Sequence, residues 1–276
     1  MSFVSLGDFR VWTEQRGEGK PLLYIGGTGE DLRQRVHVLH SLLPKHFRVL
    51  AYDQRGMGQS EIPDRPTSMR DYAADAVKLL DAMGWDECGV LGFSFGGMVA
   101  QELALLAPER VTALGLVATS AGGEGRMSSP LHAIQHLPLR ERAQQWLYWF
   151  DSRNDDEFEE KYPERYKKRL DWMMEHLKSS EEDPRLHLGE QKLLEARRWH
   201  NTWERLPMVQ TPTMLLAGEF DLVAPPNQVQ AICERLPNAE MHTLKGGHLM
   251  LWEVSRGFVL LRRFFQQQLA VLPDAS

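Results

Sequence analysis

The sequence predicts an α/β fold in which a mostly parallel sheet is flanked by helices and interrupted by a helical insertion. Short apolar runs, such as 21–25 and 212–218, alternate with longer stretches of helical periodicity, which is typical of strands joined by crossover helices. Between residues 122 and 206 the strand-like runs stop, and Trp and charged residues become frequent. A composition of 42% hydrophobic and 25% charged residues over 276 residues excludes a disordered or fibrous chain.

The elements before the insertion are delimited by residues that start or stop regular structure. Ser68 is a good helix N-cap, Gly84 a helix stop, and Pro44 and Pro108 end the helical patterns that precede them. Apolar runs of five to nine residues between such signals indicate buried strands. We therefore expect strands at 21–25, 47–52, 88–92 and 111–119, and helices at 31–43, 68–83 and 97–107.

The strand pattern resumes after the insertion. We expect strands at 212–218 and 240–244 and helices at 226–236 and 252–269. The chain is thus predicted to form one α/β core, residues 1–121 and 207–276, with a helical cap, residues 122–206.

Charge and cysteine content limit the classes of partner and compartment. The net charge is −6, whereas a nucleic-acid binder needs clustered Lys and Arg to neutralise phosphates. No apolar run reaches the ~18 to 20 residues of a membrane span, and the N-terminus lacks the basic and apolar regions of a signal peptide. The two cysteines, Cys88 and Cys233, form no disulfide framework. We expect a cytoplasmic protein with no nucleic-acid or membrane partner; a homodimer stays open.

A serine with the surroundings of a nucleophile lies between a predicted strand and a predicted helix. The run Gly92-Phe93-Ser94-Phe95-Gly96 matches the pattern G-x-S-x-G. In that context the serine sits on a sharp turn that exposes its hydroxyl, and the small residues on either side leave room for a strained backbone. The alternative is a serine that fills a Gly-rich connection. The flanking strand and helix favour Ser94 as a nucleophile.

A nucleophilic serine needs a base, and the base needs an orienting carboxylate. Of ten histidines, His248 follows the last predicted strand, at the sheet edge where open α/β folds place their ligands. Asp221 follows the strand at 212–218 and precedes a new helix, so its carboxylate lies in a turn; Glu219 is the close rival. The order Ser94, Asp221, His248 is the order described for α/β-hydrolases.

An acyl-transfer site also needs two amides that stabilise the charge on the carbonyl oxygen. The amide of Phe95, the residue after the nucleophile, is one candidate. The second is expected in the loop after the first parallel strand, with Thr28 as the first choice and Gly27 as the alternative. A phosphate-binding loop is the competing interpretation of this Gly-rich segment, but neither G-x-G-x-x-G nor Gly-Lys-Ser/Thr occurs there.

These segments together resemble the α/β-hydrolase fold family over essentially the whole chain, most clearly capped bacterial esterases, lactonases and C–C hydrolases. The run from Asp53 to Ser60 is similar to the family's D-x-R-G-x-G-x-S segment, 218–221 to its acid turn and 247–248 to its histidine loop. The resemblance implies an eight-stranded, mostly parallel sheet, a helical cap over the site, and structural roles for Asp53 and Arg55. Many members begin the oxyanion loop with His-Gly, whereas this chain has Gly26.

The resulting prediction is a metal-free and cofactor-free serine hydrolase whose small-molecule substrate carries an ester or lactone carbonyl. Ser94 attacks the carbonyl, His248 transfers the proton and Asp221 orients the imidazole. No metal-ligand spacing such as H-E-x-x-H is present. A C–C hydrolase of a keto acid or a cofactor-free perhydrolase would use the same three residues and stays open, as does a non-catalytic small-molecule receptor.

The cap is expected to form the roof of the pocket, so its aromatic residues are candidates for an apolar substrate site. Packing of the cap onto the core is the competing role for each one. Arg197 and His200, also in the predicted cap, are candidates for binding a substrate carboxylate. The predicted substrate contacts are Met98, Trp146, Trp149, Trp199 and Trp203.

Overall fold

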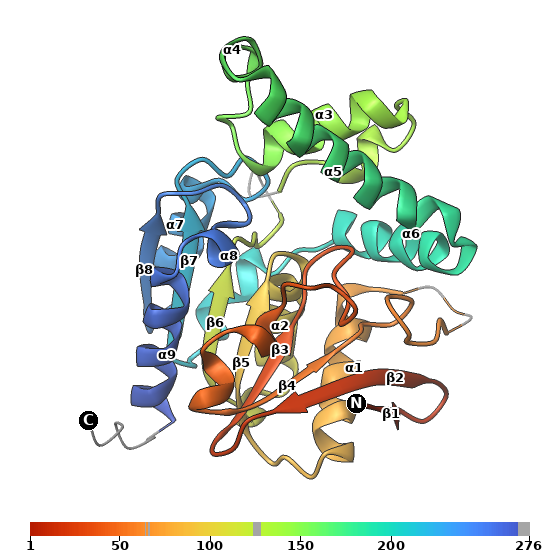
Figure 1. Ribbon diagram of the computed structural model, residues 1–276. Coiled ribbons are helices and arrows are strands. Elements are labelled where there is room, and N and C mark those ends of the chain that lie inside the picture. The colour runs from red at the N-terminus through yellow and green to blue at the C-terminus, as the bar shows by residue number, and fades with distance from the viewer. Residues whose placement is uncertain (64, 66, 124–127, 270–276) are drawn as a thin grey trace.

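A computed structural model describes residues 1–63, 65, 67–123 and 128–269 and places an eight-stranded sheet at the centre of the molecule (Figure 1). The strand order is β1-β2-β4-β3-β5-β6-β7-β8, and all pairs are parallel except β1–β2 and β2–β4. The predicted mostly parallel, eight-stranded sheet is confirmed. The strands are β1 (Ser2–Ser5), β2 (Arg10–Arg16), β3 (Pro21–Ile25), β4 (Arg48–Tyr52), β5 (Cys88–Phe93), β6 (Val111–Val117), β7 (Thr213–Gly218) and β8 (Ala239–Leu244).

Helices cover both faces of this sheet, which explains the continuous apolar runs of its central strands. Successive residues of β3 show the alternation, since Leu23 belongs to the core on one face and Leu22 to the core on the other. Helices α1 (Met69–Ala82), α2 (Phe95–Leu106) and α7 (Pro226–Arg235) contribute to the first core, and α8 (Met250–Glu253) and α9 (Arg256–Gln268) to the second. Among the described residues no helix is long and apolar enough to cross a membrane.

Four further helices lie over the carboxyl ends of the parallel strands (Figure 1). They have a small apolar core of their own, which includes Trp146, Leu170 and Met173. The division into core and cap at residues 122 and 206 stays a prediction. Near its second boundary the two parts are in contact, because Arg205 of the proposed cap forms an ion pair with Glu102 of α2. The four helices are α3 (Leu139–Phe150), α4 (Asp156–Lys161), α5 (Pro163–Glu182) and α6 (Pro184–Arg198).

Two of the predicted helices differ from the structure. The helix expected at 31–43 is wrong: this segment forms turns and the short 3-10 helices η1 (Val38–His40) and η2 (Leu43–Lys45). Polar side chains bind the local backbone instead, since Asp31 accepts from the Arg33 amide and Gln34 donates to the Gly29 carbonyl, which competes with helical hydrogen bonds.

The helix expected at 252–269 is two helices, α8 and α9. The chain between them is extended at Val254, with φ −115° and ψ 102°. The amphipathic sequence pattern therefore continues across a point where the helix is interrupted. The antiparallel strands β1 and β2 were not assigned from the sequence pattern. β1 is the edge strand and β2 is its neighbour, and both carry exposed residues, so their apolar signal is weak.

Candidate active site

Ser94 occupies a strained turn between β5 and α2. Its backbone angles are φ 53° and ψ −115°, in a region that residues with a side chain rarely adopt. The turn is tight: a Cβ at Gly96 would collide with the backbone oxygen of Ile25, and a Cβ at Gly92 with that of Gly96. Glycine is therefore required at both positions, and the strain holds the serine at the carboxyl edge of the sheet.

The structure brings Ser94, Asp221 and His248 together from three separate loops. Nδ1 of His248 lies 2.8 Å from Oδ2 of Asp221, and Nε2 of His248 lies 2.9 Å from Oγ of Ser94. An ionised carboxylate only accepts hydrogen bonds, so Nδ1 carries the proton and Nε2 accepts from the serine hydroxyl. This arrangement permits transfer of the serine proton to the imidazole.

The buried carboxylate of Asp221 is fully held by donors. Its Oδ1 accepts from the amides of Val223 and Ala224 at 2.7 and 3.0 Å, while Oδ2 receives the histidine. Asp221 is 1% exposed, and charge-assisted bonds of this kind offset the cost of burying an anion. Glu219, the rival from the sequence, is exposed. The aspartate alone is placed to orient the imidazole.

The ring of His248 is fixed by aromatic neighbours from both layers of the molecule. Phe93 at the end of β5 lies 5.4 Å from the imidazole, and Phe150 at the end of α3 lies 5.0 Å from it, between ring centroids. The backbone amide of His248 also donates to the carbonyl of Phe150. The helical layer therefore contributes directly to the position of the histidine.

Two amides are available beside Ser94 for a developing oxyanion. Phe95 is the first residue of α2, where amides have no partner inside the helix. Among the described residues no acceptor is bound by the amides of Thr28 or Phe95, whereas the amide of Gly27 donates to Oε2 of Glu30 at 2.8 Å. Of the two candidates in the first loop, Thr28 is the one whose amide is free.

Glu30, which was not predicted from the sequence, holds the loop that carries Thr28. Its carboxylate accepts from the Tyr24 hydroxyl at 2.8 Å as well as from Gly27, and Gln54 Nε2 donates to the carbonyl of Gly26 at 2.9 Å. Burial raises the pKa of Glu30 from its ordinary value. The available signal was an acidic residue directly after the run 26–29, where a short loop brings its side chain back onto the backbone.

Ser94 and His248 open into a cavity of about 530 Å³, called the Ser94 cavity here. Its wall is rich in aromatic side chains, and Trp146 is the one predicted substrate contact that lines it. Phe150 also lines the cavity and was not predicted from the sequence. It lies four residues after Trp146 on α3, and the two rings are 5.2 Å apart. The other lining residues include Thr28, Glu30, Phe93, Leu131, Trp172, His176, Leu249, Trp252 and Glu253.

The other four predicted substrate contacts do not line the Ser94 cavity, so the structure does not support a substrate-binding role for them. Met98 is buried in the core beside α1. Trp199 is 70% exposed and donates to Glu195, and Trp203 packs against Arg235 at the core surface. Trp149 is a peripheral part of the cap cluster. Helical spacing alone did not distinguish these positions from Trp146.

Arg197 and His200 do come together, but in a second pocket that shares no lining residue with the Ser94 cavity. They are therefore not placed to bind the carboxylate of a substrate held at Ser94. Asp53 and Arg55 have structural partners, as expected: Asp53 accepts from the amides of Leu32 and Gln59, and Arg55 pairs with Asp75.

The chain is similar to known proteins over most of its length. Residues 20–254 match the family model of the alpha/beta hydrolase fold. The chain belongs to the α/β-hydrolase family. This α/β-hydrolase is 28% identical over 259 residues to a poly(3-hydroxyalkanoate) depolymerase of Ectopseudomonas oleovorans, an alignment that covers 90% of this chain and 85% of the relative.

Solved structures of the family superpose on nearly the whole molecule. Est816, described as an N-acyl homoserine lactone degrading enzyme, has a TM-score of 0.75 at 25% identity, covering 95% of this chain and all of that one (100%). The enol-lactonase from Burkholderia xenovorans LB400 has a TM-score of 0.76 at 20% identity, over 96% of this chain and 100% of that chain, which shows the shared fold. The protein is a hydrolase of the α/β fold.

Proposed function

We propose that this α/β-hydrolase is a serine hydrolase that cleaves a carboxylic ester or lactone through an acyl-enzyme. The observation that carries the proposal is the continuous hydrogen-bond chain from Ser94 through His248 to Asp221, with both distances below 3 Å. A serine, a base and an orienting carboxylate in this arrangement activate the hydroxyl for acyl transfer. The names of the depolymerase and lactone-degrading relatives support the same class of bond.

The proposed reaction has two half-reactions at one serine. Oγ of Ser94 attacks the carbonyl carbon while its proton passes to Nε2 of His248, and the amides of Thr28 and Phe95 bind the oxyanion. Collapse of the tetrahedral intermediate breaks the ester C–O bond, and His248 protonates the departing alkoxide. Water then attacks the acyl-enzyme, with His248 again taking the proton. The C–O bond to Ser94 breaks as His248 returns that proton to Oγ of Ser94, and the acid is released.

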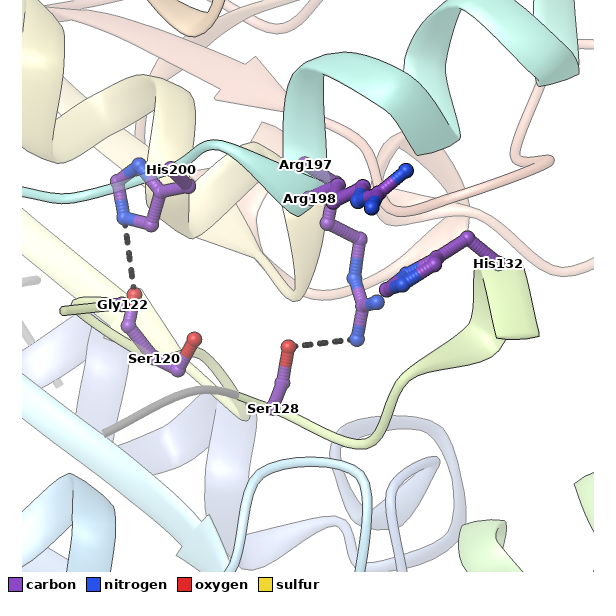
Figure 2. A pocket seen from close by; sticks show the side chains of 7 residues that line it. All are labelled: Ser120, Gly122, Ser128, His132, Arg197, Arg198 and His200. Carbon is purple, nitrogen blue, oxygen red and sulfur yellow. Dashed lines mark hydrogen bonds between the residues drawn. The ribbon is translucent and has the colours of Figure 1, made fainter. Parts of the chain in front are cut away.

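The cavity favours an uncharged acyl group. Aromatic rings form much of the wall around Ser94, and Glu30, Arg35 and Glu253 also line it, so charges of both signs are present. Apolar lining with a few polar groups is typical of sites for neutral organic ligands. Because Arg197 and His200 line another pocket (Figure 2), the keto-acid alternative loses the two residues that were its candidates for binding the substrate carboxylate.

The test is hydrolysis of p-nitrophenyl esters from acetate to dodecanoate and of an aliphatic lactone series. We expect wild type to show a maximum at one acyl length, and Ser94→Ala to lose about 10⁴-fold or more in kcat/KM. Ser255→Ala is the matched control, because Ser255 is exposed and makes no side-chain cap hydrogen bond. Ester turnover that survives in Ser94→Ala would overturn the assignment of the nucleophile.

Two further measurements, diketo-acid hydrolysis and ligand binding, separate the alternatives. Hydrolysis of a diketo acid in the absence of any ester or lactone turnover would replace the proposal with C–C bond hydrolysis. A protein that binds esters and lactones without turning them over would indicate a receptor.

A further inference from the structure

The turn that carries Thr28 is closed twice by one residue, Glu30. The backbone amide of Glu30 donates to the Gly27 carbonyl at 3.3 Å, and its Oε2 accepts from the Gly27 amide at 2.8 Å. The first bond joins residues three apart, as in a β-turn, and Gly29 at the third position has the positive φ, 72°, that a type II turn requires there. Both hydrogen-bonding groups of the Gly27 backbone are therefore bound by Glu30.

The carboxylate of Glu30 is held in turn by a central strand of the sheet. The Tyr24 hydroxyl lies 2.8 and 2.9 Å from its two oxygens, and Tyr24 is a 2% exposed residue of β3. A carboxylate that accepts from a hydroxyl and an amide recovers part of the hydration that it loses on burial. Glu30 thus connects the turn to the sheet.

The backbone leaves space for this side chain at Gly26. A Cβ at Gly26 would lie 3.1 Å from Cδ and 3.2 Å from Oε2 of Glu30, and its three nearest neighbours would all be atoms of that side chain. Gly26 does not have the positive φ that favours glycine. Glycine is therefore required at this position by the Glu30 side chain and not by the backbone.

Gly27, which Glu30 binds, lies directly beside the nucleophile. A Cβ at Gly27 would lie 3.0 Å from the Phe93 ring and 3.4 Å from Cβ of Ser94. A small displacement of Gly27 would therefore move the next amide, that of Thr28, relative to Oγ of Ser94. An oxyanion donor is effective only at about 2.7 to 3.1 Å from the oxyanion, so the stabilisation is sensitive to the position of this turn.

We propose that Glu30 is a positioning residue for the reaction at Ser94, an inference that rests on the proposed function. Its carboxylate binds the Gly27 amide and so leaves the Thr28 amide as the donor from this loop that meets the oxyanion. Without the carboxylate, the turn keeps only the backbone bond of 3.3 Å, and the Gly27 amide is released. The effect falls on the transition state, because the bound ester carries no oxyanion.

The test compares a transition-state analogue with a ground-state ligand. A trifluoromethyl ketone with the preferred acyl chain adds the Ser94 hydroxyl and forms a tetrahedral oxyanion, whereas the methyl ketone of the same chain binds without addition. In Glu30→Ala we expect kcat for the best ester and the affinity for the trifluoromethyl ketone to fall together by about 10²-fold, as when one oxyanion donor is lost. KM and the affinity for the methyl ketone should change by less than about twofold.

Two conservative variants test the same role even if Glu30→Ala does not fold. Glu30→Gln keeps one oxygen as an acceptor for the Gly27 amide, so kcat and the trifluoromethyl ketone affinity should fall by only about tenfold. Tyr24→Phe keeps the carboxylate but removes the hydroxyl that holds it, and we expect a loss of similar size. Glu14→Gln is the matched control: Glu14 is also buried, at 4% exposed, and lies in β2 outside the lining of the Ser94 cavity, so both quantities should stay at their wild-type values.

Gly26→Ala tests whether the glycine acts through Glu30. The added methyl group displaces the Glu30 carboxylate, so kcat should fall about tenfold when Glu30 is present. In the Glu30→Ala background the space is open, and Gly26→Ala should lower kcat by less than about twofold more. Such non-additivity is typical of residues in contact, whereas independent residues have additive effects.

Four results would overturn the inference while leaving the proposed function intact. Ester turnover and trifluoromethyl ketone affinity could be unchanged in Glu30→Ala. KM alone could rise, which would make Glu30 a substrate contact. The ratio of the two ketone affinities could stay at its wild-type value while the melting temperature falls, which would indicate a purely structural role. The effects of Gly26→Ala and Glu30→Ala could be additive, which would mean that the two residues act separately.

One result would overturn the proposed function itself. A wild-type protein that neither hydrolyses esters and lactones nor binds the trifluoromethyl ketone would have no oxyanion to stabilise at Ser94, and the role of Glu30 would be overturned with it.

Discussion

The Ser94 cavity and the pocket lined by Ser120 and Arg197 both contain buried polar groups, but they differ in how those groups are bonded. In the first, the Asp221 carboxylate has three donors and His248 has a partner on each ring nitrogen. In the second, among the residues that the structure describes, Arg197 donates to neutral oxygens and the Ser120 hydroxyl has no partner. The comparison teaches that the groups proposed for catalysis are each held by several hydrogen bonds from the protein, whereas burial alone does not ensure such bonding in the other pocket.

The largest expected effect is the loss of kcat when the carboxylate that binds His248 is replaced. Asp221→Asn keeps the size of the side chain but allows its amide to face the imidazole as a donor, which favours the wrong histidine tautomer. We expect kcat for the best ester to fall by about 10⁴-fold, with KM changed much less. Steady-state kinetics check this, and Glu219→Gln, at the exposed rival carboxylate, should retain activity. Equal losses in the two variants would mean that Asp221 does not orient the base.

A smaller effect is expected from the pH dependence of stability at His200. Burial lowers the pKa of His200 to about 3 from 6.5. Between pH 6.5 and 3 the unfolded chain therefore binds a proton that the folded protein does not, and the unfolding free energy falls as pH falls. This loss amounts to about 2 kcal/mol between pH 7 and pH 5.

His200→Gln should remove that component, because glutamine does not titrate and its amide can still donate to the Ser120 carbonyl. Urea denaturation at pH 7 and pH 5 measures the difference. The exposed His136 provides the control, and His136→Gln should follow the wild-type pH dependence. If His200→Gln loses as much stability as wild type between the two pH values, His200 is not the group that titrates on unfolding.

The smallest expected effect is a difference in ester kinetics between variants of two tryptophans in the helical layer. Trp146 is 2% exposed and lines the Ser94 cavity, whereas Trp199 is 70% exposed. Trp146→Ala should change the preferred acyl length and raise KM for the best ester about tenfold, equivalent to about 1.4 kcal/mol of lost contact. Trp199→Ala should change kcat/KM by less than about twofold. Similar kinetics in the two variants would show that the substrate does not reach Trp146.

The positions of the three residues proposed for catalysis were predictable because each lies within a few residues of a strand end. Ser94 follows β5, Asp221 follows β7 and His248 follows β8. Parallel strands bring their carboxyl ends to one edge of the sheet, so local signals at three strand ends point to a single site. The N-cap of α1 at Ser68 was also predictable from a local signal, since a capping box is a pattern within four residues.

Contacts between segments that are distant in the sequence were not predictable in this way. The sequence pattern favoured a helix at 31–43, but there Asp53 binds the Leu32 amide from another loop, and turns replace the helix. Glu30 was missed for a different reason: its partners Tyr24 and Gly27 are near it in the sequence, but they contact its carboxylate through an irregular loop that no periodic pattern predicts. Helical spacing grouped Trp146 with Trp149, whereas the structure puts Phe150 beside Trp146 at the cavity.

The sequence by itself determined the α/β class, the order of most strands and helices, and the three residues to consider for acyl transfer, because turn chemistry and periodicity act over a few neighbouring residues. Tertiary structure alone decided which aromatic rings line the cavity at Ser94, which amide of the first loop has no acceptor among the described residues, and that Arg197 and His200 lie in a separate pocket. Burial and hydrogen-bond satisfaction depend on every segment packed around a group, and no local pattern encodes them.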